Sequence, residues 1–153
     1  MSHVVVIMIT LVLATSCSEN VRSPHSLRVP TNITRIDVQA PDGRVLKRID
    51  ISDDIQRVIS FLLSRRKHWT YTDMGFPTPP LELFFYRGDQ RLGRFGAGRY
   101  RADCRDPAPG YFESDLPRDG QLPLYGIGAS EDDLRAFLAL VGMPEYSLDT
   151  NDC

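Results

Sequence analysis

Six arginines lie close together in the second half of the sequence, and guanidinium groups bind carboxylates and phosphates through paired N–H donors. Over positions 87–105 these six cations face only two acids, Asp89 and Asp103, which leaves a local net charge of +4. The arginines are Arg87, Arg91, Arg94, Arg99, Arg101 and Arg105, with Tyr86, Phe95 and Tyr100 interleaved. This stretch therefore predicts an anion-binding surface.

If residues 91–101 form a strand, side-chain alternation predicts Arg91, Arg99 and Arg101 on one face and Arg94 with Tyr100 on the other, unless a bulge at the glycines of 96–98 changes the register. A hairpin with a solvated arginine face is the alternative interpretation. It is favoured by the 16 arginines and 2 lysines of the whole chain, which make Arg the ordinary cation of this sequence.

A second candidate surface is the aromatic and proline-rich stretch that holds Trp69, Tyr71 and Phe76, followed by prolines at 77, 79 and 80. Rigid aromatic side chains on a loop are typical of protein interfaces. A long loop that covers an open sheet face would use the same residues. The sequence leaves both interpretations open.

Residue patterns for catalysis are scarce. The only histidines after the first few residues are His25 and His68, and no Gly-x-Ser-x-Gly, Walker or His-Glu-x-x-His motif occurs. The carboxylate pair Asp53/Asp54 is better explained as helix capping than as acid–base chemistry. No cysteines or histidines have the spacing of a zinc site. We therefore predict no catalytic residues, no cofactor and no metal.

The N-terminus carries an export signal. Residues 4–14 form an apolar run that is too short to cross a bilayer, and the small residues Ala14, Thr15 and Ser16 precede Cys17. The segment resembles the signal peptides of bacterial lipoproteins, which implies that Cys17 is acylated after cleavage. Ala14 occupies a position where that motif prefers Leu, Val or Ile, and ordinary signal peptidase would cut at the same bond.

The resemblance also implies a location. A lipid on Cys17 would hold the protein in the bacterial cell envelope, and because Ser18 follows the cysteine, we expect the outer membrane, with the protein facing the periplasm.

The number of cysteines supports acylation of Cys17, since it leaves the even pair Cys104 and Cys153. A disulfide between them would close a loop of about 50 residues and contribute about 4 kcal/mol. The alternative is a buried thiol at Cys104 and a loose C-terminal Cys153.

Composition predicts a single globular domain after this signal. The net charge is −2, which argues against a surface built for nucleic acid. We expect a signal peptide at 1–16, a lipidated cysteine and flexible tether at 17–31, one domain at 32–146 and a C-terminal tail at 147–153. The fold class is α+β, a mostly antiparallel sheet of about five strands with two helices.

The order of elements follows from periodicity and turns. Alternation predicts a hairpin at 33–51 around Asp42-Gly43, a central strand at 81–86, a hairpin turn at Gly88-Asp89 leading into a strand at 91–102, and weaker strands at 111–113 and 122–125. Helical spacing predicts one helix at 53–66, capped by Ser52 and ended by the cations at 65–67, and a second that starts with the capping box of Ser130 and Asp133 and ends at Gly142.

These features together predict a non-catalytic binding or accessory module of the envelope. Its expected partners are the membrane, through the lipid anchor, and an envelope protein or an anionic glycan or lipid, but no nucleic acid. Two other function classes stay open. One is an envelope enzyme whose site is built from residues scattered in the sequence, and the other is a periplasmic immunity or inhibitor protein.

Overall fold

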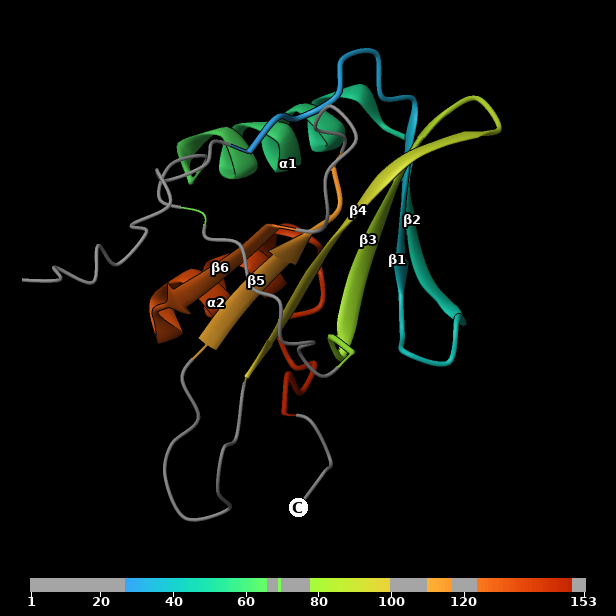
Figure 1. The fold of residues 1–153 in the computed structure, drawn as a ribbon. Coiled ribbons are helices and arrows are strands. Elements are labelled where there is room, and N and C mark those ends of the chain that lie inside the picture. Colours follow the sequence, from blue (N-terminus) through green and yellow to red (C-terminus); the bar gives the residue numbers. More distant parts are fainter. Residues whose placement is uncertain (1–26, 66–68, 70–77, 100–109, 117–123, 150–153) are drawn as a thin grey trace, which may run out of the picture.

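Six antiparallel strands form one sheet with two helices on the same face (Figure 1). The structure, a computed structural model, describes residues 27–65, 69, 78–99, 110–116 and 124–149. The elements are β1 (Arg35–Gln39), β2 (Val45–Ile49), α1 (Ser52–Ser64), β3 (Leu81–Arg87), β4 (Gln90–Arg99), β5 (Gly110–Ser114), β6 (Leu124–Ala129) and α2 (Glu131–Leu140). The predicted α+β class and element order are confirmed, with six strands where about five were expected.

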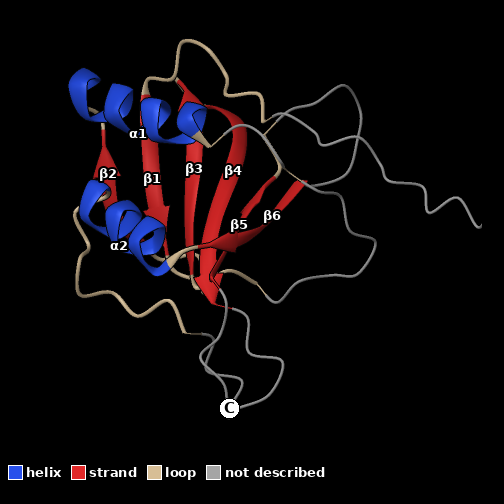
Figure 2. Cartoon of the chain, turned by 90° about the vertical axis from the view of Figure 1, so that its left-hand side faces the viewer, coloured by secondary structure: helices blue, strands red, loops and turns tan. Residues whose placement is uncertain are grey.

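The strands lie in the order β2-β1-β3-β4-β5-β6, so that the predicted central strand β3 sits between β1 and β4. Both helices lie in front of the sheet when it is viewed from their side (Figure 2). The two predicted hairpin turns are present at Asp42-Gly43 and Gly88-Asp89. Among the residues that the structure describes, no helix is long and apolar enough to cross a membrane.

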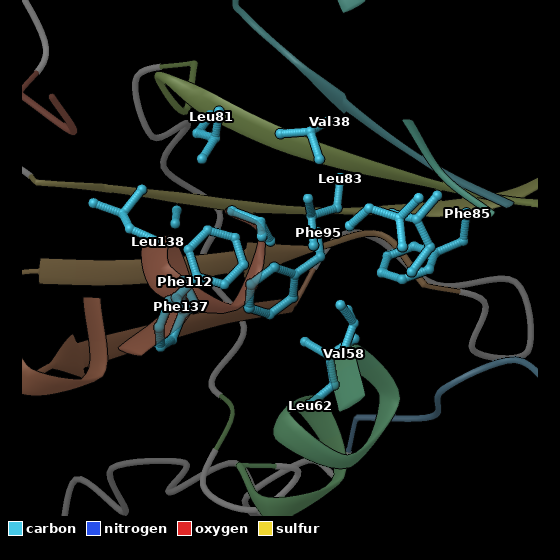
Figure 3. Packing of buried hydrophobic residues seen from close by; sticks show 14 of the residues in the cluster. Val38, Val58, Leu62, Leu81, Leu83, Phe85, Phe95, Phe112, Phe137 and Leu138 are labelled. Atoms are coloured by element: carbon cyan, nitrogen blue, oxygen red, sulfur yellow. The ribbon is translucent and has the colours of Figure 1, made fainter. Parts of the chain in front are cut away.

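The hydrophobic core fills the space between the helices and the sheet (Figure 3). The phenyl rings of Phe95, Phe112 and Phe137 lie with their centroids 5.2 to 5.8 Å apart, and Val58 and Leu62 of α1 join them. Burial of each such side chain contributes about 1.5–3 kcal/mol. Because side chains alternate along a strand, the residues between these core residues point to the opposite face of the sheet.

The first helix differs from its prediction at both ends. Its N-cap is Ile51, which makes no capping hydrogen bond through its side chain, while Ser52 is already helical. At the other end the helix stops at Ser64, and Arg65 turns its guanidinium to Asp133 of α2. The cation at this end therefore links the two helices across the core layer rather than serving only the end of its own helix.

The second helix matches its prediction. Ser130 accepts a hydrogen bond from the Asp133 N–H, and the Asp133 carboxylate accepts one from the Ser130 N–H, which completes the capping box. At the C-terminal end Gly142 has φ +72°, and the N–H of Met143 donates to the carbonyl of Leu138. This is the Schellman arrangement, in which glycine accepts the left-handed conformation without strain.

Both ends of the described chain contribute to the core. Leu27, inside the predicted tether, and Leu148, inside the predicted tail, are buried. The carbonyl of Leu148 accepts a hydrogen bond from the Arg99 N–H, and Arg99 pairs with Asp149 in a parallel bridge. One apolar side chain on each side of the expected 32–146 range therefore packs into the core.

Candidate functional site

The face of the sheet that carries no helix holds charged and aromatic side chains, and we call it the helix-free face. Strand register places them in rows across neighbouring strands. Tyr86 pairs with Arg35 on one side and with Arg91 on the other. In the next row Phe84 pairs with Asp37 of β1 and Arg94 of β4, and Arg48 of β2 pairs with Asp37. The row from β2 to β4 thus reads Arg, Asp, Phe, Arg.

Arg94 is the centre of this face. Its two terminal nitrogens contact one carboxylate each, Glu82 of β3 and Glu113 of β5, and its Nε lies 3.3 Å from Asp115 Oδ2. The backbone N–H of Arg94 also donates to Asp115. Arg91 approaches the same carboxylate, with Nη2 at 3.3 Å from Asp115 Oδ2. We call Glu82, Arg91, Arg94, Glu113 and Asp115 the Arg94 cluster, in which two cations face three acids.

Burial sets the titration of this cluster. The pKa of the Glu113 carboxyl is raised because burial penalises its charged form, and Glu82 and Asp115 add to the effect while Arg94 opposes it. Burial would lower the pKa of Arg94, but the hydrogen bond to Glu82 and the neighbouring carboxylates outweigh it and raise that pKa. Arg94 therefore stays charged, and burial favours the protonated form of Glu113.

A second ionic group lies at the β1–β2 end of the face. Asp37 is buried, and its Oδ1 lies 3.1 Å from Arg48 Nε and 3.4 Å from Arg35 Nε. The guanidinium carbon of Arg35 stands 4.2 Å from the centroid of the Tyr86 ring, which is cation–π geometry. Here two cations face one acid, the reverse of the imbalance in the Arg94 cluster.

The structure corrects the predicted distribution of arginines. Arg91 and Arg94 share the helix-free face, whereas Arg99 lies on the helix-covered side, where it binds Glu131 of α2 at 2.7 Å. The reason is a bulge near Leu92 between the pairs Phe85/Gly93 and Tyr86/Arg91, which moves Arg91 to the other face. Tyr100 and Arg101, also predicted for this surface, lie outside the described residues.

Trp69 is a core residue and not part of a surface patch. It is 2% exposed, its indole N–H donates to the Arg65 carbonyl at 2.6 Å, and its ring meets Phe95 edge-on. Tyr71 and Phe76 lie outside the described residues. Of the prolines in the same stretch, Pro79 and Pro80 are buried, which favours the interpretation that this part of the chain covers the sheet.

The glycines of β4 explain how these prolines come so close. A Cβ on Gly96 would stand 2.5 Å from a ring carbon of Pro79, and a Cβ on Gly98 would stand 2.8 Å from one of Pro80. The bulge that the sequence left open at these glycines is absent, since the register to β3 runs unbroken from 93 to 97 and the register to β5 from 95 to 99. Their role is to admit the prolines against the strand.

Several residues of the site were absent from the sequence-based prediction: Arg35, Asp37, Arg48, Glu82, Glu113 and Asp115. Asp37, Glu82 and Glu113 each stand between two buried side chains in a strand, both apolar around Asp37 and Glu82, and Phe112 and Ser114 around Glu113. An acid flanked in this way alternates onto the face opposite the core, and three such acids on separate strands are a signal that could have been recognised.

Other predicted positions stay untested. Cys17, Cys104 and Cys153 lie outside the described residues, as does His68. Within the described ranges, no three histidine, cysteine, aspartate or glutamate side chains are grouped so that they could hold a metal ion. Comparison with known proteins finds no matching family model, no similar curated protein and no similar solved structure.

Proposed function

We propose that this chain is an exported binding module, anchored to the bacterial envelope by a lipid on Cys17, and that it acts by contact rather than by catalysis. The observation that carries the proposal is the apolar run at 4–14 with small residues before Cys17, followed shortly in the sequence by Leu27, which packs in the core of the domain. A short link between a cysteine and a packed domain is typical of an anchored module.

The arrangement of charges supports binding as the mode of action. On the helix-free face, Arg94 and the acids around it are bound to one another, so that their geometry is fixed by mutual hydrogen bonds. Such a network holds side chains in place for recognition. Partly exposed arginine and aromatic side chains around it are residue types that interfaces favour.

Mass measurement of the intact protein tests the anchor. Expressed with its own signal in a bacterium, the mature protein should exceed the mass of residues 17–153 by a diacylglycerol, with or without a further acyl chain. A Cys17→Ser variant is the control and should lack this mass. A mature protein with an unmodified Cys17 thiol would contradict the proposal.

The predicted disulfide between Cys104 and Cys153 remains part of the proposal. It is supported by the parallel pairing of Arg99 with Asp149, since these residues precede the two cysteines by five and four positions. Peptide mapping without reduction should find one cross-linked peptide pair. Two separately alkylated cysteines in protein taken from the periplasm would contradict it.

An envelope enzyme is the second candidate, and Glu113 is the observation that favours it. A carboxyl with a raised pKa beside a second carboxyl, Glu82, is the combination that general acid–base catalysis uses. Under this alternative, Glu113→Gln should abolish the biological effect of the protein while leaving partner binding intact. Under the binding proposal, the same variant should retain the biological effect whenever it retains the partner.

A further inference from the structure

On the helix-free face the side chains of Arg48 and Arg91 are exposed, whereas the acids Asp37, Glu82 and Glu113 are largely buried. The side chain of Arg48 is 55% exposed and that of Arg91 is 49% exposed, whereas that of Asp37 is 6% exposed. Arg48 contacts Asp37 through its Nε. Arg35 and Arg91 each stack on an aromatic ring, Tyr86 and Phe84. The buried acids and rings hold these guanidinium groups in fixed positions.

Among the described residues, the two ends of the helix-free face carry opposite net charge. At the β1–β2 end, Arg35 and Arg48 surround Asp37 and leave an excess of one positive charge. At the β4–β5 end, the Arg94 cluster has three acids against two arginines and leaves an excess of one negative charge. A surface of uniform negative charge, such as phospholipid headgroups or a polyphosphate, would be attracted at one end and repelled at the other.

The first described residues lie on the other side of the sheet. The segment that begins at 27 runs beside α1 in the helix layer before it reaches β1 (Figure 1). The helix-free face is therefore the side of the sheet that these first described residues leave uncovered.

We infer that the helix-free face is the docking surface for a protein with both signs of charge, which places carboxylates on Arg35 and Arg48 and a cationic side chain near Asp115. Phe84 and Tyr86 supply the apolar centre of this surface between the two charged ends. The inference deepens the proposed function, because it rests on a binding role and names the chemistry of the partner. It excludes a lipid surface or a polyanion as the occupant.

Photo-cross-linking locates the partner. Tyr86→p-benzoylphenylalanine in the full-length protein, expressed in its host, should give one protein adduct after irradiation. The same replacement at Gln56, an exposed position of α1, is the control and should not give that adduct. No adduct from position 86, or the same adduct from both positions, overturns the inference.

Charge reversal then tests the chemistry with the purified partner. Arg48→Glu should weaken binding about 100-fold, and replacement of the opposing partner carboxylate by arginine should restore it. Arg48→Gln, a milder change for the fold, should weaken binding about 10-fold. Arg135→Glu, at an exposed arginine of α2, should leave binding unchanged. Binding that is insensitive to both Arg48 variants overturns the inference.

Vesicles separate the inference from the anchor. The unlipidated Cys17→Ser protein should not sediment with phosphatidylglycerol vesicles, and sedimentation that Arg48→Glu abolishes would overturn a protein occupant in favour of lipid. The mass of the wild-type protein reports the lipid on Cys17 independently. A lipidated protein without the expected docking therefore fails this inference alone, and a docking protein without lipid fails only the proposed anchor.

Discussion

On the helix-covered face of the sheet, Phe95, Phe112 and Phe137 pack ring against ring, whereas on the helix-free face Arg94 holds three carboxylates. Apolar packing stabilises the fold by removing area from water and is insensitive to pH. A half-buried ionic cluster gains little net stability, because desolvation offsets attraction, but it loses much when one partner is removed. The helix-covered face of the sheet thus supplies most of the stability, whereas the helix-free face carries an ordered arrangement of charged side chains.

Removal of the central cation should have the largest effect on the ionic face. Arg94→Met leaves Glu82, Glu113 and Asp115 without their shared partner and should cost about 3–5 kcal/mol of unfolding free energy at pH 7. The loss should be smaller near pH 4, because the Glu113 carboxyl, whose pKa is raised by burial, is then neutral and no longer needs the cation. Urea denaturation at both pH values measures this. Arg57→Met, an exposed arginine of α1, is the control and should change stability by less than about 0.5 kcal/mol. An equal loss at both pH values would show that Arg94 acts through packing.

Truncation on the apolar face should give a loss that pH does not change. Leu62 is 1% exposed, and Leu62→Ala should cost about 2–5 kcal/mol through lost burial and the cavity left behind. The neighbouring Leu63 is 42% exposed, so Leu63→Ala is the matched control and should cost far less. Thermal denaturation of both variants at pH 5 and pH 7 separates the two faces. A loss of stability in Leu62→Ala that changes with pH would contradict the assignment of this face to apolar packing alone.

The capping box of α2 should contribute less than either face. Ser130→Ala removes the acceptor for the Asp133 N–H and should cost about 1 kcal/mol. Ser60→Ala, at an exposed position within α1, should have almost no effect. Chemical denaturation measures both variants. Equal values for the two serines would mean that the hydrogen bonds of the box are replaced by water without loss.

The smallest expected effect is a slope of melting temperature against pH. Because the folded-state pKa of Glu113 is raised above its ordinary value of 4.5, the protonated form is favoured in the fold. Its contribution to stability is therefore present below 4.5 and is lost as the pH rises through the folded-state pKa. The melting temperature should rise as the pH is lowered from 7 towards 4.5, and Glu113→Gln should flatten this slope. A wild-type slope of opposite sign would contradict the assignment.

Below pH 4.5 the melting temperature also depends on a second carboxyl group, that of Asp133. The pKa of Asp133 is lowered from 3.8, chiefly by its hydrogen bond from Arg65, with Ser130 adding to the effect. The stability it contributes is present above 3.8 and is lost as the pH falls through the lower, folded-state pKa. The signs of Glu113 and Asp133 are opposite, so the slope due to Glu113 is best read above pH 4.5.

Features that depend on neighbouring residues could be predicted from the sequence. Asp42-Gly43 and Gly88-Asp89 mark their turns through local backbone preference, and Ser130 with Asp133 marks the start of a helix. Helical spacing also marked α1, on which Ile55, Val58 and Leu62 are buried and Ile59 is partly buried. Each of these depends on contacts only a few residues apart, which a sequence displays directly.

The candidate site could not be predicted, because it depends on register between distant strands. The Arg94 cluster exists because Glu82 and Glu113 both lie opposite Gly96, on strands that flank β4. The face of Arg91 was mispredicted because one extra residue near Leu92 reverses the alternation. The density of arginines in the sequence suggested a strand with unpaired cations. In the structure, Arg91 and Arg94 of β4 are paired with acids from other parts of the chain.

The burial of both Leu27 and Leu148 affects when the chain can fold during its synthesis or export. An unfolded chain that leaves a ribosome or a membrane channel N-terminus first cannot complete its core until Leu148 has emerged. Truncation within the last described residues should therefore act as a folding defect rather than the loss of a dispensable end.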